Sequence, residues 1–424
     1  MRRAAKFITD WEWLILLFLI PLLLFPTGWR GLLLLIIPLL WVIRKAATGH
    51  FVPPTPLDIS IFLMLIALLL SLAAVFDMQS SFPKIAGLII GIAFYYGAVQ
   101  YTRTYSNGVY HLLGLILISG TGMTVLASLS NFQTQTLTIF NLLFVRFPIP
   151  FFTLPIFNAT EVNFNEIAGI IGWYFPLLLV TFVGFWREMW QSGRWSLRFA
   201  HIALLFILLI SIFLHLSTRS RGGIASVILA ILLVIAIRYQ WGRWFLLTLG
   251  IVAVALSYLD FGVLMVGESQ ATDFGLEGRL EIWSRGLYGL ADFPITGMGL
   301  NGFRQVVHIL YPLFTISPDF DLGHAHNHLL QAGLDLGIFG LIAYLAIWLV
   351  CLAMIWKGWK HAQRHSDRVL IAGLCGSLAA GWFFGVFDAI ALGARPGFLW
   401  WLLVGLLVST FDNIWSQLRS SNRR

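Results

Sequence analysis

Residues 323–331, GHAHNHLLQ, form the centre of the longest polar interruption in this chain, which runs from Leu259 to Tyr344. Nearly all of the remaining sequence is apolar. The interruption therefore separates hydrophobic segments before it from hydrophobic segments after it. Its closely spaced histidines are the first candidates for chemistry.

The composition of the chain is that of a membrane protein. Hydrophobic residues make up 59% of the sequence and charged residues only 11%, whereas a soluble domain has about 25% charged residues. Many apolar runs are long enough to cross a hydrocarbon core of about 30 Å as helices. The net charge is +8, but most basic residues lie in short loops between apolar runs, where membrane topology explains them. We therefore predict an all-α polytopic membrane protein and exclude nucleic acid as a partner.

The apolar runs predict about twelve transmembrane helices in a single membrane domain, residues 1–424. With both termini in the cytoplasm, about two thirds of the 27 lysines and arginines lie inside, as the positive-inside rule requires. Two long loops, 128–165 and 259–332, then lie outside, the second between spans nine and ten. The predicted spans are 11–25, 31–43, 59–76, 85–101, 109–127, 166–186, 199–216, 222–238, 243–258, 333–356, 369–387 and 396–411.

Two outer arginines, Arg219 and Arg221, run against this charge bias and need another explanation. They precede Gly222 and Gly223, which let the backbone approach a ligand or a neighbouring helix closely. The free N–H groups at the start of the next span favour an anion, and a guanidinium holds a phosphate through two parallel hydrogen bonds. We consider a phosphate site here, with binding of lipid phosphates by the same arginines as the alternative.

A helix is expected over 276–292, where it ends before Pro294. A rotation of about 100° per residue places Arg279 at the edge of an apolar face, where it needs a carboxylate or an anionic substrate as its partner. Glu281 and Arg285 lie on the other side and are expected to form a solvated pair of small effect. The apolar face comprises Leu276, Leu280, Trp283, Leu287 and Leu290.

The histidines of the central stretch suggest either a metal site or a general base. Side chains two residues apart diverge on a helix, and the only close carboxylates are Asp319 and Asp321, so we expect no metal and no cofactor. His326 lies just before the expected helix, and an ordinary histidine pKa of about 6.5 suits a general base or a proton shuttle. The alternative is a histidine that only hydrogen-bonds a loop. Asn327 is a suitable N-cap for the following span.

Two pairs of polar residues lie at the ends of other predicted spans. Asn165 and Glu166 open span six and are expected to cap it. Asp388 and Arg395 flank the last outer loop and are expected to pair with each other.

Four short motifs follow one another on the predicted outer side of the membrane. They are SRGG at 220–223, RLEIW at 279–283, PITGMG at 294–299 and HNHLLQ at 326–331. In this order, in a chain of twelve spans with one large outer loop, they resemble the bacterial O-antigen ligase and O-antigen polymerase superfamily. The resemblance covers about residues 160–345.

The resemblance implies a metal-independent glycosyltransferase of the bacterial inner membrane. Its donor would be a glycan on undecaprenyl diphosphate, and its acceptor the lipid A core, another lipid-linked glycan or a protein. Arg221 and Arg279 would hold the diphosphate and stabilise its departing charge, and His326 would activate or position the acceptor hydroxyl. Further candidates for binding the diphosphate or the glycan are Arg219, Asn165 and Asn327.

Two other functions are compatible with a polytopic membrane protein. A transporter for bicarbonate or another small anion should place its polar groups near the bilayer midplane, often in two related halves. Here the polar groups gather on the outer side, and we find no matching halves. A non-catalytic assembly protein would not need Arg221, Arg279 and His326 to converge.

Overall fold

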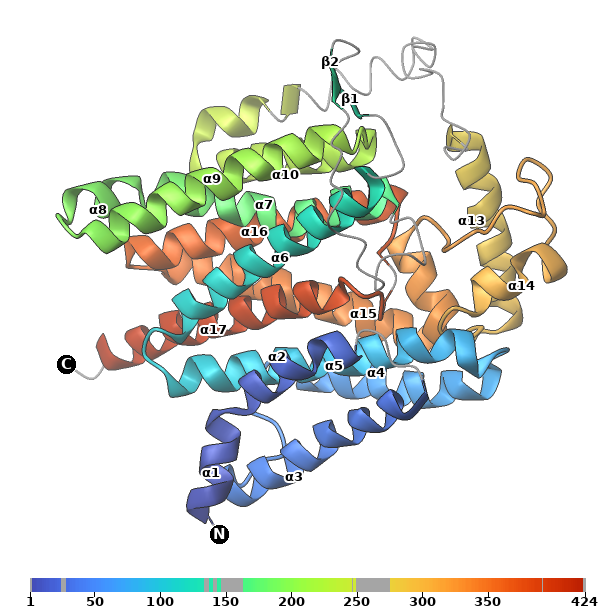
Figure 1. Ribbon diagram of the computed structural model, residues 1–424, viewed down its shortest axis with the longest axis horizontal. Coiled ribbons are helices and arrows are strands. Elements are labelled where there is room, and N and C mark those ends of the chain that lie inside the picture. Colours follow the sequence, from blue (N-terminus) through green and yellow to red (C-terminus); the bar gives the residue numbers. More distant parts are fainter. Residues whose placement is uncertain are drawn as a thin grey trace.

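The computed structural model describes residues 2–23, 28–132, 137–139, 143–145, 163–245, 247–248, 275–390 and 392–421. Within these ranges the chain is a bundle of helices with one antiparallel hairpin, β1 (Leu137–Ile139) and β2 (Leu143–Val145), in which Thr138 pairs with Phe144. Figure 1 shows that the long helices of the bundle run side by side.

Nine helices in the described residues are long and apolar enough to cross a membrane. They are Gly31–Thr48, which joins η1 (Gly28–Leu35) to α3 (Ile36–Thr48), then α5 (Met78–Thr104), α6 (Gly108–Phe132), α7 (Phe164–Gly184), α9 (Trp195–Ser217), α10 (Arg221–Arg238), α15 (His328–His361), α16 (His365–Phe387) and α17 (Gly397–Ser421). The shorter elements are α1 (Arg2–Asp10), α2 (Glu12–Leu23), α4 (Asp58–Ser71), η2 (Leu72–Ala74), α8 (Trp186–Gln191), α13 (Gly275–Asp292) and α14 (Gly302–Leu310).

The expectation of a polytopic helical membrane protein is confirmed, whereas the number twelve stays a prediction. The predicted span 59–76 is the shorter apolar helix Asp58–Ala74. The predicted spans 11–25 and 243–258 continue into residues outside the described ranges. The long loops 128–165 and 259–332 also lie partly outside these ranges, so their full courses stay predictions.

The centre of the bundle is formed by α5, α7, α16 and α17. Between 72% and 78% of the residues in their apolar windows are buried, against 28% in α9 and α10. α16 packs against α7 and α10, and α17 packs against α5. Most residues in the apolar windows of α9 and α10 are therefore not buried. Compared with α5, α7, α16 and α17, these two helices present more apolar surface to the lipid.

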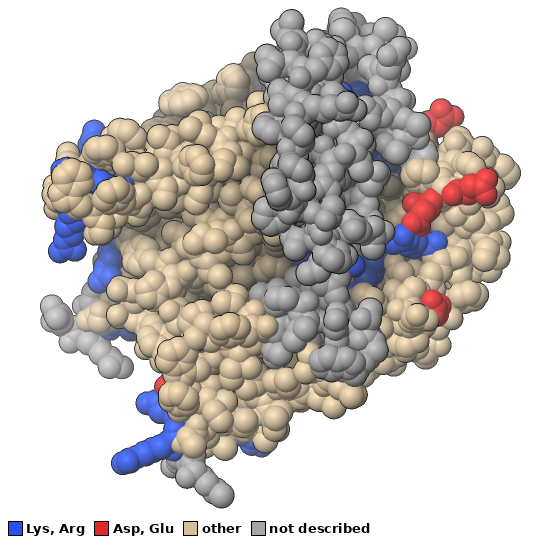
Figure 2. Space-filling model, in the orientation of Figure 1, with Lys and Arg blue, Asp and Glu red and all other residues tan. Residues whose placement is uncertain are grey.

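Charged side chains gather at the two ends of the bundle (Figure 2). α1 and the end of α17 lie toward the left of Figure 1, and α13 and α14 lie at the right. On the face in Figure 2, basic side chains gather at the left end, and basic and acidic side chains gather at the right end. The described (tan) surface between the two ends in Figure 2 shows few charged side chains. This distribution is the one expected for a bundle that crosses a membrane; the assignment of the left end to the cytoplasm stays a prediction.

Residues 275–327 form a small cap over the right-hand end of the bundle. The cap has a hydrophobic core of its own, built around Ile282, Phe303, Val307 and Leu322, and this core also includes Leu334 of α15. α13 and α14 both contact α15. The cap is therefore attached to the bundle mainly through the first part of α15.

α15 is broken at Gly337, which has φ 68° and ψ −170°. The loop of the PITGMG motif fills the break, because Met298 N donates to Leu334 O over 2.6 Å and Ile338 N donates to Pro294 O over 2.8 Å. A Cβ at Gly337 would lie 2.2 Å from Ile295 O, so this close approach requires glycine. Residues 338–361 alone are about 36 Å long at 1.5 Å per residue, enough to cross the membrane. The predicted span 333–356 lies within α15 and includes this break. Where the membrane-crossing part of α15 begins stays a prediction.

Candidate active site

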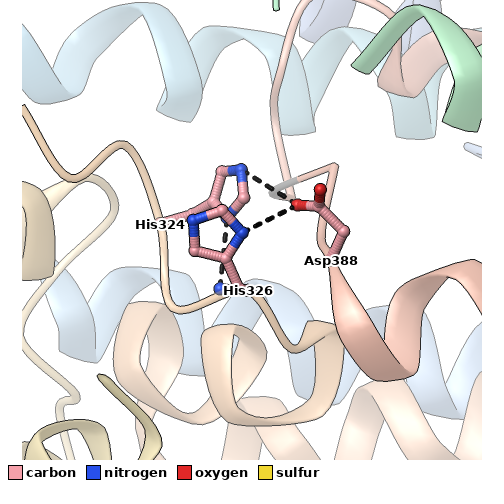
Figure 3. A group of neighbouring side chains, drawn as sticks. All are labelled: His324, His326 and Asp388. Carbon is pink, nitrogen blue, oxygen red and sulfur yellow. Dashed lines mark hydrogen bonds and ion pairs between the residues drawn. The ribbon is translucent and has the colours of Figure 1, made fainter. Parts of the chain in front are cut away.

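His324, His326 and Asp388 converge at the cap end of the bundle (Figure 3). His326 Nδ1 lies 3.2 Å and His324 Nε2 lies 3.4 Å from the same carboxylate oxygen, Asp388 Oδ1. The two imidazole centroids are 4.4 Å apart. The histidines come from the loop before α15, and the carboxylate comes from the residue that follows α16. The prediction that the histidines diverge is wrong for this pair, because they precede the helix and His326 has φ 48°.

The protonation states of the cluster follow from its hydrogen bonds and burial. Burial opposes ionisation of Asp388, but its contacts with His326 and His324 and the N–H of Ala389 outweigh burial and lower the pKa of Asp388. Burial lowers the pKa of His324 to about 3, so this imidazole is neutral at pH 7. Its Nδ1 accepts from His326 N at 3.2 Å, so its proton sits on Nε2 and faces Asp388.

Neighbouring elements hold His326 in its strained backbone conformation. Trp283 of α13 donates from Nε1 to His326 O over 3.3 Å. Asn327 caps α15 as predicted, because its Oδ1 accepts from Leu329 N and Leu330 N at 3.0 Å each. Its Nδ2 donates to Val386 O of α16 over 3.1 Å. Asn327 thus ties the histidine loop to the end of the helix that supplies Asp388, and this is a structural role.

A buried polar network supports the same loop from below. Gln331 Oε1 accepts from Ala325 N at 2.7 Å, and Gln331 Nε2 donates to Asp335 Oδ1 over 2.9 Å. Asp335 Oδ1 also accepts from Asn301 N at 3.3 Å. Gln331, Asp335 and Asn301 are all buried. Because buried polar groups are costly to leave unpaired, this network fixes the position of the loop relative to α15 and the cap.

The third histidine of the motif, His328, belongs to a different environment. Its Nδ1 lies 3.0 Å from the hydroxyl of Tyr344, and its ring packs edge-on against Trp348 and Trp382. The side chain lines an aromatic pocket with Trp348. His328 therefore points away from the cluster of His324, His326 and Asp388.

Of the two predicted catalytic arginines, Arg279 lies on a helix that bonds to the histidine loop. Arg279 is half-buried on α13, one turn before Trp283, which bonds to His326. Arg221 is exposed at the first position of α10, and Arg219 is exposed with φ 53°. The convergence of Arg221 and Arg279 with His326 stays a prediction.

The close backbone approach predicted for the two glycines of the SRGG motif is found at Gly223 and not at Gly222. A Cβ at Gly223 would lie 2.5 Å from Cβ of Ala168, so Gly223 lets α10 pack closely on α7. At Gly222 the space is open to 4 Å. Ser220 caps α10 by accepting from Gly223 N at 3.2 Å. The start of α10 therefore lies beside the start of α7.

The polar residues at the start of α7 differ from the prediction. Asn163, rather than Asn165 or Glu166, caps α7, and its side chain accepts from Asn165 N at 2.9 Å. Asn165 is half-buried in the first turn. Asp388 faces the two histidines, and Arg395 interacts electrostatically with Glu166. The predicted pair of Asp388 and Arg395 stays a prediction.

The apolar face predicted for α13 is partly wrong. Trp283 and Leu290 pack against the hydrophobic core of the cap as expected, but two of the leucines do not. Leu280 and Leu287 of the predicted apolar face are 53% and 60% exposed. The helix instead buries Ile282, Gly286 and Gly289. A Cβ at Gly286 would lie 2.7 Å from Leu330 Cδ2, so the small residues form the packing surface toward α15.

The Glu281–Arg285 pair forms, but it is not solvated. Arg285 Nη2 lies 3.7 Å from Glu281 Oε1, and the side chains are 20% and 12% exposed. Glu281 also accepts from the backbone N–H groups of Phe314 and Thr315 at 2.6 and 2.9 Å and from the hydroxyl of Thr315. Arg285 lies over the ring of Phe314 at 5.3 Å. The pair fastens the chain near Phe314 to α13.

Three charged residues near the cluster were missed as site candidates. Asp388 lies in it, Glu166 interacts electrostatically with Asp388 and Lys84, and Lys84 interacts with His324. A signal was present for Lys84, because a lysine on the predicted outer side runs against the charge bias, as Arg219 and Arg221 do. For Asp388, no sequence spacing indicated that a residue after α16 would meet the loop before α15.

Comparison with known families now bears on this geometry. Residues 204–345 match the family described as O-antigen ligase. This part of the chain, about a third of its length, is thus similar to the O-antigen ligase family. No curated protein matches it.

The match contains Arg219, Arg221, Arg279 and His326 and ends before Asp388. Together with the apolar helices, the match supports a multi-pass membrane protein of the glycan ligase and polymerase kind. The match gives no support to the alternative of an anion transporter.

Proposed function

We propose that this protein, which is similar to the O-antigen ligase family over residues 204–345, transfers a glycan from undecaprenyl diphosphate to an acceptor hydroxyl on the outer side of the inner membrane. The acceptor is the lipid A core in a ligase, another lipid-linked glycan in a polymerase, or a protein. The observation that carries the proposal is the contact between Asp388 and His326 at the cap end of the bundle. No step of the reaction is assigned to a metal or a cofactor.

The ionised Asp388 orients the imidazole of His326 as a base. A proton on Nδ1 is stabilised by the carboxylate, and the lone pair then resides on Nε2. The 3.2 Å contact tightens with a small rotation of the ring, as catalytic hydrogen bonds commonly do when substrate binds. Nε2 accepts the proton of the acceptor hydroxyl, whose oxygen bonds to the anomeric carbon. The bond from that carbon to the phosphate oxygen breaks, and a single displacement of this kind inverts the anomeric centre.

Arginines supply the charge that the departing diphosphate needs. Arg279 lies on the helix that bonds to the histidine loop through Trp283, and Arg221 begins α10 next to the start of α7. Guanidinium groups bind phosphate oxygens through parallel hydrogen bonds. Preorganised donors of this type are worth about 10²–10³-fold in rate when one is removed. Arg219, Asn165 and Asn327 stay candidates for glycan contacts.

The test is a transfer assay with purified protein in lipid. The donor is a glycan on undecaprenyl diphosphate, the acceptor is lipid A core, a second lipid-linked glycan or an acceptor peptide, and released undecaprenyl diphosphate is measured. We expect acceptor-dependent release by the wild type and loss of release in His326→Ala and Arg279→Ala. The acceptor that supports release names the branch of the superfamily.

A matched control removes an arginine at the opposite end of the bundle. Arg103 pairs with Asp412 at 2.6 Å, and Arg103→Ala should keep its transfer rate. No release with any of the three acceptors, from protein that is monodisperse and folded, would contradict the proposed transfer.

A further inference from the structure

Three side chains, the proposed base His326 among them, have the composition of a transition-metal site. Two imidazole nitrogens and one carboxylate oxygen, from His324, His326 and Asp388, all lie within 4.8 Å of one another. We propose that these three residues, the zinc triad, bind Zn²⁺ reversibly and that bound zinc switches the transferase off. Zinc binding is independent of the proposed function, whereas the switching rests on it.

The distances in the triad fit tetrahedral coordination. Zinc binds histidine nitrogen and carboxylate oxygen at about 2.0–2.2 Å, so two ligand atoms on one ion are about 3.3 Å apart in a tetrahedron. The observed distances to Asp388 Oδ1 are 3.4 Å from His324 Nε2 and 3.2 Å from His326 Nδ1. Small ring rotations bring the two nitrogens to the same spacing. Three protein ligands leave a fourth position for water.

One atom of the triad lacks a satisfying partner. His326 Nδ1 is buried and has no hydrogen-bond partner in the described part of the chain, because its approach to Asp388 has the distance but not the alignment of a hydrogen bond. A buried polar atom without a partner is costly. A metal ion between the nitrogen and the carboxylate would satisfy both.

The triad is accessible enough to exchange an ion and buried enough to hold it. The side chains of His324, His326 and Asp388 are 21%, 14% and 8% exposed. Lys84 and Arg304 interact electrostatically with His324, and their positive charge opposes binding of a cation. Glu166 interacts electrostatically with Asp388, and its negative charge favours binding of a cation. Imidazole ligands select zinc and related transition metals over Mg²⁺ and Ca²⁺, which prefer oxygen ligands.

Zinc bound in this way would remove the base of the proposed reaction. When Nδ1 of His326 coordinates the ion, the proton of the neutral imidazole moves to Nε2, which can then no longer accept the proton of the acceptor hydroxyl. His324 changes in the same sense: Nε2 coordinates, Nδ1 takes the proton and gives up the bond from His326 N. Asp388 stays ionised, so the net proton count of the triad does not change.

Binding is tested first, on purified full-length protein stripped of metal. Zinc is titrated by calorimetry, and Co²⁺ is used as a probe because tetrahedral Co²⁺ has characteristic visible absorption. We expect one site in the wild type and at least about 10-fold weaker binding in both His324→Ala and Asp388→Asn. Unchanged zinc affinity in these two variants, with normal monodispersity, would overturn the site.

A second pair of variants tests whether zinc binds at the zinc triad or at the three histidines that are close in sequence, His324, His326 and His328. His328→Gln keeps a hydrogen-bonding group beside Tyr344 and should keep zinc affinity, because His328 points into the aromatic pocket. His308→Ala removes a histidine of the cap that contacts Phe320 O at 2.8 Å, and it should also bind zinc like the wild type. Loss of binding in His328→Gln would overturn the assignment.

The switch is then tested in the transfer assay. Zinc should inhibit the wild type, a chelator should restore its rate, and Mg²⁺ should have no effect at the same concentration. The zinc concentration for half inhibition should match the calorimetric dissociation constant within a few-fold and rise at least about 10-fold in His324→Ala. Activation by zinc, or inhibition that persists unchanged in His324→Ala, would overturn the switch. Absence of transfer in every condition would contradict the proposed function and leave the binding result standing.

Discussion

Oδ1 of Asp388, the residue that follows α16, lies 3.2 Å from Nδ1 of His326 in the loop before α15. The family match contains His326 and ends at residue 345, so the partner of the proposed base comes from a part of the chain beyond the match. Asn327 reinforces the same junction through Val386. The candidate site is thus completed by the packing of α16 against α15, and its geometry depends on the core of the bundle.

Asp388→Asn is expected to lower kcat by about 10²–10⁴-fold, because the asparagine neither holds the required tautomer of His326 nor stabilises its protonated form. The KM for the lipid-linked donor should change little, since the diphosphate is held elsewhere. Thermal unfolding in detergent checks that the fold is intact. Asp412→Asn, which removes the partner of Arg103 at the other end, is the matched control. An equal loss in both variants would assign the effect to stability.

Arg221→Lys and Arg279→Lys are expected to retain more activity than the corresponding alanine variants and less than the wild type. Lysine keeps the positive charge but cannot form the two parallel bonds of a guanidinium. We expect a loss of about 10²–10³-fold for each alanine. Single-turnover rates with saturating donor separate this effect from weaker binding. Equal rates for lysine and alanine at either position would show that charge alone is not what that arginine supplies.

The sequence predicted much of the architecture, because long apolar runs and the charge bias act through transfer free energies that depend little on context. It also predicted Asn327 as a cap, since capping is a local interaction. The phase of α13 was not predictable in this way. Hydrophobic periodicity selected Leu280 and Leu287, whereas the structure buries Gly286 and Gly289 against Leu330 and Leu334.

The missed partner of His326 has a similar cause. Asp388 and His326 meet only because α15 and α16 pack together and the chain turns after α16. Such long-range packing has no signature in local spacing. The convergence of His324 and His326 could not be predicted from the sequence either. It requires a positive φ at His326, which histidine adopts infrequently.

Gly337→Ala is expected to destabilise the protein by about 3 kcal/mol or more, because the backbone conformation there is almost restricted to glycine and the added Cβ overlaps Ile295 O. The PITGMG loop should separate from the break in α15. Limited proteolysis of the cap and thermal unfolding measure the two effects. Gly114→Ala is the control, since a Cβ there meets open space and alanine favours a helix by about 0.5–1 kcal/mol. Unchanged unfolding of Gly337→Ala would show that the break in α15 does not require glycine at this position.

Protonation of Glu281 is expected to loosen the cap at low pH. Burial opposes ionisation of this carboxyl, but the hydrogen bonds from Thr315 and Phe314 and the charge of Arg285 outweigh burial and lower the pKa of Glu281 below its ordinary value of 4.5. A carboxyl with a lowered pKa in the folded state contributes stability that is complete above the unfolded pKa and is lost as the pH falls through the folded pKa. The loss therefore begins below about pH 4.5.

Hydrogen exchange of the Phe314 and Thr315 amides, corrected for the intrinsic pH dependence of exchange, measures this effect directly. Both amides donate to Glu281, so their protection should fall below pH 4.5 in the wild type. In Glu281→Gln their protection should be low and nearly independent of pH over the same range. Glu277→Gln, an exposed position on the same helix, should behave like the wild type. Protection in Glu281→Gln that follows the wild-type pH profile would show that another group controls this part of the cap.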